Sequence, residues 1–339
     1  MFEHEEAGAK SETRFWLFRE GMRLTTTLYL GAREGMKLTT LYLGAREEVR
    51  LAILYLVAIA GAEVVTNFFS LVVGVICHTI LLAVLIVHSS LVGESPSHKL
   101  LLALCLAPLT RIMSLSMPLA QFSPIYWYLI IYPALFLAAW VAMRRLNLTA
   151  SEVGLTVRKL PLQLVVALTG FIFGVAEYLI LRPEPLISEL YWGAVLFPAF
   201  VLLAGSGFVE EFVFRGVLQR ASMGALGRWG LPYVALVFAV LHLIHLSAID
   251  IAFVFAIALF FGWVVYRTGS LLGVTLSHGI TNILLYLIIP FLLPAVGWSW
   301  ETMLEGMHPA LIIVLSALAT AFLLALGLAL ESWAWKRGW

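Results

Sequence analysis

The sequence predicts an all-α protein, a polytopic transmembrane helical bundle of about 8 to 10 spans. Of the 339 residues, 62% are hydrophobic and only 12% are charged, about half the charged share of a soluble domain. The apolar residues fall in runs of about 20, long enough for a helix to cross a hydrocarbon layer of roughly 30 Å. The alternating pattern of a transmembrane β-barrel is not found, so helices are the predicted way to cross the bilayer.

Residues 1–50 form a polar N-terminal region, which we expect to lie in water. Within it, GMRLTTTLYLGARE at 21–34 is followed directly by the near-copy GMKLTTLYLGARE at 35–47. Two copies are too few to bury the core of a solenoid. We therefore interpret the tandem repeat as a recent duplication or a mis-assigned start, without a function of its own.

Apolar runs fill the rest of the chain, and the first two are either separate spans or one broken or tilted helix. The expected spans lie near 51–66, 68–92, 100–119, 124–143, 161–181, 192–214, 232–247, 249–266, 271–294 and 309–331. They divide the chain into N-terminal transmembrane helices (51–145), a cytoplasmic loop (146–160), a membrane core (161–290), and a C-terminal span and anchor (291–339).

Loop charges predict the orientation, because cytoplasmic loops carry an excess of Lys and Arg. One set of alternate loops carries Arg50, Lys99, Arg144, Arg145, Arg158, Lys159, Arg220, Arg228 and Arg267, and the opposite set carries Glu184, Glu189, Glu301 and Glu305. Both termini of this multi-pass protein are therefore predicted to be cytoplasmic, in the cell membrane or an endoplasmic-reticulum-like membrane. A net charge of +1 gives no electrostatic case for nucleic acid, so the expected partner is the lipid bilayer.

Ionisable residues inside the spans are costly in a bilayer, and each one suggests a function. Glu210 lies ten residues before Arg220, His242 ten residues after the start of its span, and His278 eleven residues after Arg267. At about 1.5 Å of rise per residue, each is roughly 15 Å deep. The three side chains therefore share one level, which predicts an active site between helices near the membrane midplane.

Residues four apart on a helix share a face. This spacing pairs His278 with Asn282, Glu211 with Arg215, and Phe238 with His242. The second pair lets an arginine enter the bilayer at reduced cost, while Glu210 is rotated by about 100° from Glu211 and faces elsewhere.

The grouped residue types are suited to hydrolysis. A carboxylate in an apolar pocket can act as a general base, so Glu210 with His242 could activate a water molecule. His278 and Asn282 could then donate hydrogen bonds to the oxyanion of a tetrahedral intermediate. Glu210, His242 and His278 would also suit a divalent metal such as zinc with an open fourth position. No HExxH motif is present, and the sequence leaves both readings open.

Three motifs carry a resemblance to a known family. EEFVFR, FAVLH and SHGITN resemble the EExxxR, FxxxH and HxxxN motifs of the CPBP family (CAAX proteases and bacteriocin-processing enzymes), also called Abi, which includes the Ras-converting CAAX prenyl endopeptidase. The resemblance covers roughly residues 161–290, the expected catalytic core. It implies an intramembrane protease that cuts near the C-terminus of a membrane-anchored peptide or prenylated protein.

By this resemblance, Glu210 and His242 activate the water and His278 and Asn282 form the oxyanion site. Glu211 and Arg215 are implied to have structural or electrostatic roles. The alternative within the same family is a non-proteolytic membrane scaffold or a bacteriocin-immunity-type protein. A proton-coupled transporter is disfavoured, because the inverted repeats expected of one are not seen.

Four further polar residues of the spans have no assigned role in hydrolysis. Glu63 and Glu177 are membrane-level carboxylates for which the sequence offers no partner. His245 is interpreted as a packing residue, and Asp250 as the marker of a helix turn.

Overall fold

The computed structural model describes residues 47–116, 123–295 and 309–336. The tandem repeat at 21–47 therefore lies outside the described residues, except for its last residue, Glu47. The chain divides into two units, Met1–Arg50 and Leu51–Trp339, and the second unit is the one described below. Within the described ranges all regular structure is helical and no strand occurs. Nine of these helices are long and apolar enough to cross a membrane. The predicted all-α polytopic bundle is therefore confirmed, and the protein is a multi-pass membrane protein.

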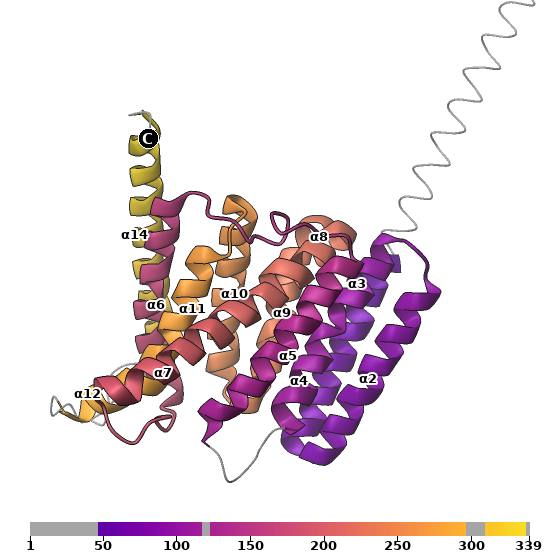
Figure 1. The fold of residues 1–339 in the computed structure, drawn as a ribbon, viewed down its shortest axis with the longest axis horizontal. Helices are drawn as coiled ribbons and strands as arrows, with labels where there is room; N and C mark the ends of the chain where they lie inside the picture. The colour runs from indigo at the N-terminus through magenta and orange to yellow at the C-terminus, as the bar shows by residue number, and fades with distance from the viewer. Residues whose placement is uncertain (1–46, 117–122, 296–308, 337–339) are drawn as a thin grey trace, which may run out of the picture. The chain divides into compact units, whose positions relative to one another are not determined.

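The first two expected spans are separate helices, because the helix Glu47–Phe68 ends before Ser70, whose hydroxyl caps the next helix. Helices α3 and α4 follow each other with only Cys105 between them and together form one span, Pro96–Ser116. The N-terminal helices after Glu47–Phe68 are α2 (Leu71–Leu91), α3 (Pro96–Leu104), α4 (Leu106–Ser116) and α5 (Pro124–Arg145) (Figure 1).

The expected spans 192–214 and 232–247 belong to one unbroken run of helical turns, Trp192–His245. The run changes direction after α8, where Gly227 adopts a positive φ of 58° that glycine tolerates, and α8 packs against α9. Its parts are α7 (Trp192–Leu202), the π-helices η1 (Leu203–Glu210) and η2 (Phe212–Leu218), α8 (Gln219–Leu226), η3 (Gly227–Trp229), α9 (Gly230–Leu241) and η4 (His242–His245).

Helix α11 occupies a central position, because it packs against both α6 and η1. Helix α6 in turn packs against α14, and α10 packs against α9 (Figure 1). The remaining bounds are α6 (Leu160–Leu181), α10 (Ala248–Thr268), α11 (Leu272–Ile283), η5 (Leu284–Ile288), α12 (Ile289–Ala295) and α14 (Pro309–Lys336).

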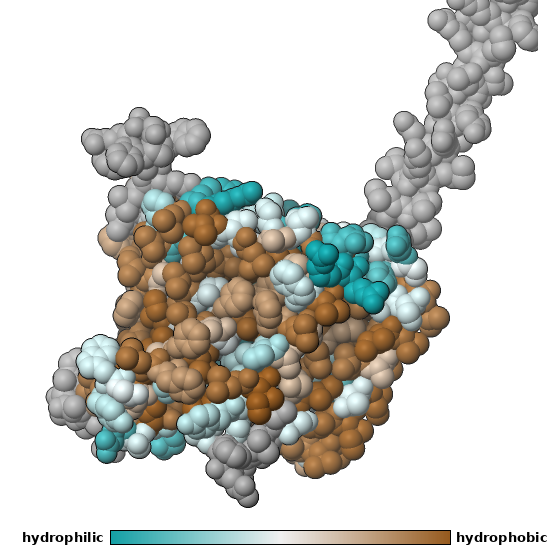
Figure 2. Space-filling view, viewed as in Figure 1, coloured by the Kyte–Doolittle hydropathy of each residue, from teal (hydrophilic) through white to brown (hydrophobic). Residues whose placement is uncertain are grey.

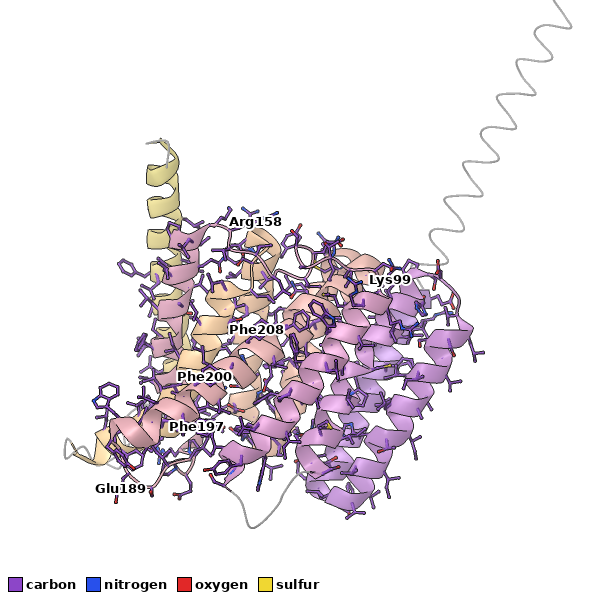
Figure 3. All side chains as sticks on the ribbon, viewed as in Figure 1. Lys99, Arg158, Glu189, Phe197, Phe200 and Phe208 are labelled. Atoms are coloured by element: carbon purple, nitrogen blue, oxygen red, sulfur yellow. The ribbon has the colours of Figure 1, made fainter. Side chains whose placement is uncertain are left out.

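Apolar side chains cover much of the outside of these helices, as expected of a surface that faces lipid. Figure 2 shows this apolar surface, with hydrophilic residues concentrated near its edges. In Figure 3, Lys99 and Arg158 lie toward one edge and Glu189 lies at the other, while Phe197 and Phe200 project from α7. The predicted cytoplasmic placement of both termini stays a prediction.

Candidate active site

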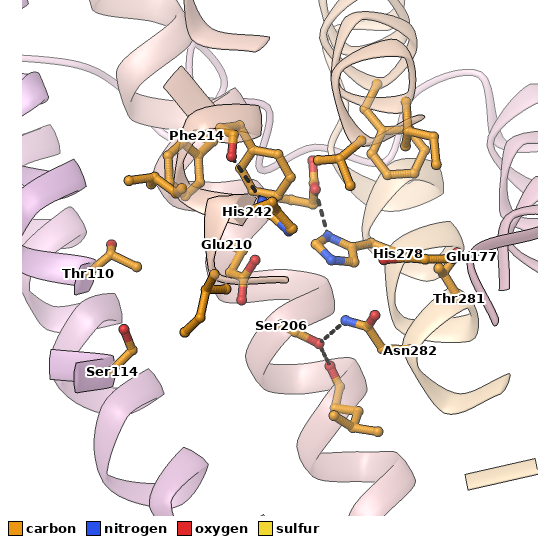
Figure 4. A pocket seen from close by; sticks show the side chains of 18 of the residues that line it. Thr110, Ser114, Glu177, Ser206, Glu210, Phe214, His242, His278, Thr281 and Asn282 are labelled. Atoms are coloured by element: carbon orange, nitrogen blue, oxygen red, sulfur yellow. Dashed lines mark hydrogen bonds and ion pairs between the residues drawn. The ribbon is translucent and has the colours of Figure 1, made fainter. Parts of the chain in front are cut away.

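A cavity of about 310 Å³ lies among the helices of the membrane core. Its lining includes every residue to which the sequence analysis assigned a catalytic or supporting role: Glu210, Glu211, Arg215, Phe238, His242, His278 and Asn282. Figure 4 labels Glu210, His242, His278 and Asn282 around it. They come from η1, η2, α9, η4 and α11, together with Glu211 between the two π-helices. The structure thus brings these side chains to one place, while their catalytic roles stay predictions.

Glu210 ends the π-helix η1 and points to a partner on another helix. The hydroxyl of Tyr132, on α5, donates a hydrogen bond to Glu210 Oε1 over 3.0 Å. Oε2 is then the oxygen left for a water molecule. Tyr132 was missed in the sequence analysis, because it belongs to no motif and lies 78 residues away along the chain.

Glu211 faces a different neighbour from Glu210, as the helical spacing predicted. Its Oε1 accepts a hydrogen bond from Arg215 Nη1 over 2.9 Å and lies 2.8 Å from His278 Nδ1. The guanidinium of Arg215 also lies 4.2 Å from the centre of the Phe238 ring, a cation–π contact. The carboxylate of Glu211 therefore holds an arginine and a histidine from two helices in a fixed arrangement.

His242 is oriented by the turn of helix that precedes it. Its Nδ1 lies 2.9 Å from the backbone oxygen of Phe238. A carbonyl oxygen can only accept, so Nδ1 must carry the hydrogen, and Nε2 of the neutral ring keeps a lone pair. The Phe238 and His242 rings lie 4.7 Å apart at their centres, the packing that their spacing predicted.

The amide of Asn282 is fixed by a serine that the sequence analysis did not identify. Asn282 Nδ2 donates to Ser206 Oγ over 2.8 Å, and Ser206 Oγ donates to the backbone oxygen of Leu202, also over 2.8 Å. Because the serine hydrogen is used in the second bond, Ser206 must accept from Asn282, which leaves one N–H of the amide free. The helical spacing could have indicated Ser206, because it lies four residues before Glu210.

Close helix packing holds the two walls that carry Glu210 and Asn282 together. Gly207 of η1 meets Gly279 of α11, and a Cβ added to Gly207 would lie 3.0 Å from the Cα of Gly279 and 2.9 Å from the backbone oxygen of Thr275. Any larger residue would force the two helices apart. Small residues at such a contact are typical of helix packing in membranes.

The side chains predicted as metal ligands are not gathered around one point in this structure. No group of three or more His, Cys, Asp or Glu side chains within the described ranges is arranged to hold one. Glu210, His242 and His278, the predicted ligands of a metal, instead bond through one atom each to Tyr132, Phe238 and Glu211. Each of the three keeps a second donor atom, Oε2 or Nε2, so the metal site stays a prediction. The mechanism proposed below uses protein groups and water.

Helices outside the motifs complete the cavity. Glu177 of α6, which had no assigned partner, lines it, as do His245 and Tyr132. Asp250 lies in the first turn of α10, and Ser247 caps that helix. This agrees with the interpretation of Asp250 as the marker of a helix turn. Arg111 of α4 also lines the cavity and was missed, although an arginine within an apolar span is itself a signal of function.

One comparison with known protein families finds a match within the membrane core. Residues 192–284 match the family model described as "Type II CAAX prenyl endopeptidase Rce1-like". We call the matched residues the Rce1-like domain. The match is consistent with the CPBP resemblance found from the motifs, over a shorter range than the 161–290 expected. The Rce1-like domain contains all seven motif residues that line the cavity, whereas Arg111, Tyr132 and Glu177 lie outside it. No curated protein and no solved structure matches the chain.

Proposed function

We propose that this protein is an intramembrane endopeptidase that hydrolyses a peptide bond near the C-terminus of a membrane-anchored, CAAX-type substrate. The observation that carries the proposal is the meeting of Glu210, His242, His278 and Asn282, from separate segments of the chain, around one cavity inside an Rce1-like domain. The peptide bond would lie between Glu210, which acts as the base for the attacking water, and the hydrogen-bond donors of His278 and Asn282.

The attack on the peptide bond begins at Glu210. Its Oε2 takes a proton from a water molecule, while the Tyr132 hydroxyl holds Oε1 and His242 Nε2 accepts a hydrogen bond from the second O–H of that water. The water oxygen forms a bond to the peptide carbon, and the carbonyl electrons move to its oxygen. This produces a tetrahedral oxyanion.

Two donors stabilise the oxyanion. The free N–H of Asn282 supplies one, because its other N–H is bonded to Ser206. The second would come from His278 Nε2, which can donate only when the ring carries both hydrogens, because Nδ1 faces the carboxylate of Glu211. The intermediate then collapses, the C–N bond breaks, and the proton on Glu210 passes to the leaving amine, which restores the starting state.

Purified full-length protein in lipid nanodiscs, given a quenched fluorescent CAAX peptide with and without a farnesyl group, tests this proposal. We expect cleavage by the wild type, and a loss of at least about a hundredfold in kcat for Glu210→Gln and for His242→Ala, since general-base groups contribute roughly 10² to 10⁴ in rate. Glu184→Gln is the matched control, because Glu184 is an exposed carboxylate in the loop before α7.

The outcomes separate the two functions considered for this family. Full activity of folded Glu210→Gln would refute the assigned mechanism. Absence of cleavage for every peptide by the wild type would favour a non-proteolytic scaffold or immunity protein. Better cleavage of the farnesylated peptide than of the bare one would identify the substrate as prenylated. Limited proteolysis of sealed vesicles at either end of the chain would test the cytoplasmic placement of both termini.

A further inference from the structure

The catalytic cavity has a wall that no motif accounts for. Helix α4 contributes Thr110, Arg111 and Ser114 to the lining, and Figure 4 shows Thr110 and Ser114 on a helix next to the segment that carries Glu210. This wall lies outside residues 192–284, the part of the chain that matches the family model. Its chemistry is therefore not explained by the groups that carry out hydrolysis.

Arg111 is the charged residue of this wall, and it is held rigidly. The residue is 5% exposed. Its Nε and Nη2 donate to the two oxygens of Glu63, which is fully buried, and Nη1 donates to Ser114 Oγ over 3.3 Å. His78 Nε2 approaches the same Glu63 carboxylate to 3.2 Å. The guanidinium is thus positioned from behind by residues of three different helices.

This arrangement leaves one side of the guanidinium available. Arg carries five N–H donors, and three of them are used in the bonds to Glu63 and Ser114. The remaining two, on Nη1 and Nη2, can bind a second planar anion. Arg111 lines the same cavity as His242 and His245.

The other charged groups of the cavity would not take an anion. Arg215 is 2% exposed, bonded to Glu211, and lies close to the rings of Phe238 and Phe261. Glu177 and Glu210 also line the cavity, and a carboxyl group never carries the positive charge that attracts an anion. His278 is assigned to the oxyanion of the scissile bond, so Arg111 is the group of this lining that offers a place for the carboxylate at the peptide end.

We propose that Arg111 binds the free α-carboxylate at the end of the substrate peptide and so sets where along the chain the enzyme cuts. This inference rests on the proposed endopeptidase function. A volume of about 310 Å³ is at the lower end of the range for small-ligand pockets, so it suits a short chain end. Arginine is the residue best matched to the planar, two-oxygen geometry of a carboxylate.

The test compares two farnesylated CAAX peptides of the same sequence, one with a free α-carboxylate and one with a C-terminal carboxamide. Full-length protein in nanodiscs should cleave the acid with a kcat/KM roughly tenfold or more above that of the amide, the range for a hydrogen bond to a charged group. In Arg111→Gln this ratio should fall to about one. Arg111→Lys should retain part of the ratio.

Two further variants keep the test decisive. Arg228→Gln makes the same change at an exposed arginine outside the cavity and should keep the wild-type ratio. If Arg111→Gln fails to fold because Glu63 is left unpaired, Glu63→Gln with Arg111→Gln removes both charges, and the ratio is measured there instead.

Equal cleavage of acid and amide by the wild type would overturn the inference and leave the endopeptidase proposal standing. A ratio that survives in Arg111→Gln would overturn it in the same way. If anionic lipid rather than the peptide end occupies the guanidinium, the wild-type ratio would again be about one, and the inference would also fail. A wild type that cleaves neither peptide would remove the proposed function, and this inference with it.

Discussion

Neutralising Glu211 should destabilise the protein far more than the same change at a surface glutamate. Glu211 is fully buried, and its Oε1 serves both Arg215 and His278 at 2.9 and 2.8 Å. Nε and Nη2 of Arg215 have no hydrogen-bond partner among the described residues, so Glu211 is the acceptor that offsets the buried positive charge. Glu211→Gln keeps the shape of the side chain but leaves Arg215 uncompensated.

The expected magnitude follows from the burial of the pair. Breaking a buried ion pair by removing one partner costs about 3 to 5 kcal/mol, which corresponds to a fall in Tm of roughly 10 °C for a chain of this size. The matched control is Glu152→Gln. Glu152 pairs with Arg220 over 3.1 Å, but the two side chains are 38% and 52% exposed, and exposed pairs contribute about 1 kcal/mol or less.

Thermal unfolding of both variants in the same detergent, followed by a thiol-reactive or intrinsic fluorescence signal, provides the measurement. A second variant, Glu211→Gln with Arg215→Gln, should regain part of the lost stability, because it removes the charge that the first change left alone. If Glu211→Gln and Glu152→Gln shift Tm equally, or if the double variant loses the sum of both single losses, the reasoning about this pair is wrong.

The remaining predictions concern the oxyanion site, helix packing and pH. Asn282→Ala should lower kcat by about 10² to 10³, and Ser206→Ala, which removes one neutral hydrogen bond to that amide, by about tenfold at most, both measured as peptide cleavage. Gly279→Ala should lower stability by roughly 1 to 3 kcal/mol because its Cβ would meet Leu203, whereas Gly224→Ala, with open space around it, should not lower Tm. Hydrogen bonds from the backbone and hydroxyl of Thr149, together with Arg220, lower the pKa of Glu152. The contribution of Glu152 to folding stability is therefore present above the ordinary glutamate pKa and is lost as pH falls through the lowered value. In Glu152→Gln, Tm measured against pH should fall less steeply on the acid side.

The span positions could be predicted closely because hydrophobic length and flanking charge determine them. The expected span 161–181 is α6, Leu160–Leu181, and the expected 249–266 is α10, Ala248–Thr268. The π-helical geometry of residues 203–218 was not predicted. Nothing in the local pattern specifies it, and π-helical turns are often found at functional sites.

The gathering of the motif residues around one cavity was predictable for a different physical reason. An ionisable side chain in an apolar span has to face the interior of the bundle, and equal depth then brings Glu210, His242 and His278 to one level. Their partners were not predictable in this way. The contact of Tyr132 with Glu210 joins helices 78 residues apart, and it depends on the rotation of α5, which hydropathy does not specify.

We propose that helices outside the matched range determine substrate choice. Residues 192–284 carry the groups proposed to activate water and hold the oxyanion. Arg111, Tyr132 and Glu177, which line the same cavity from α4, α5 and α6, lie outside that range. If the match specifies the reaction and these helices hold the end of the substrate, then replacing α4 residues should change which peptide ends are accepted while kcat for the accepted ones stays nearly constant. A change at α4 that lowered kcat equally for every peptide would instead assign this wall to the chemistry itself.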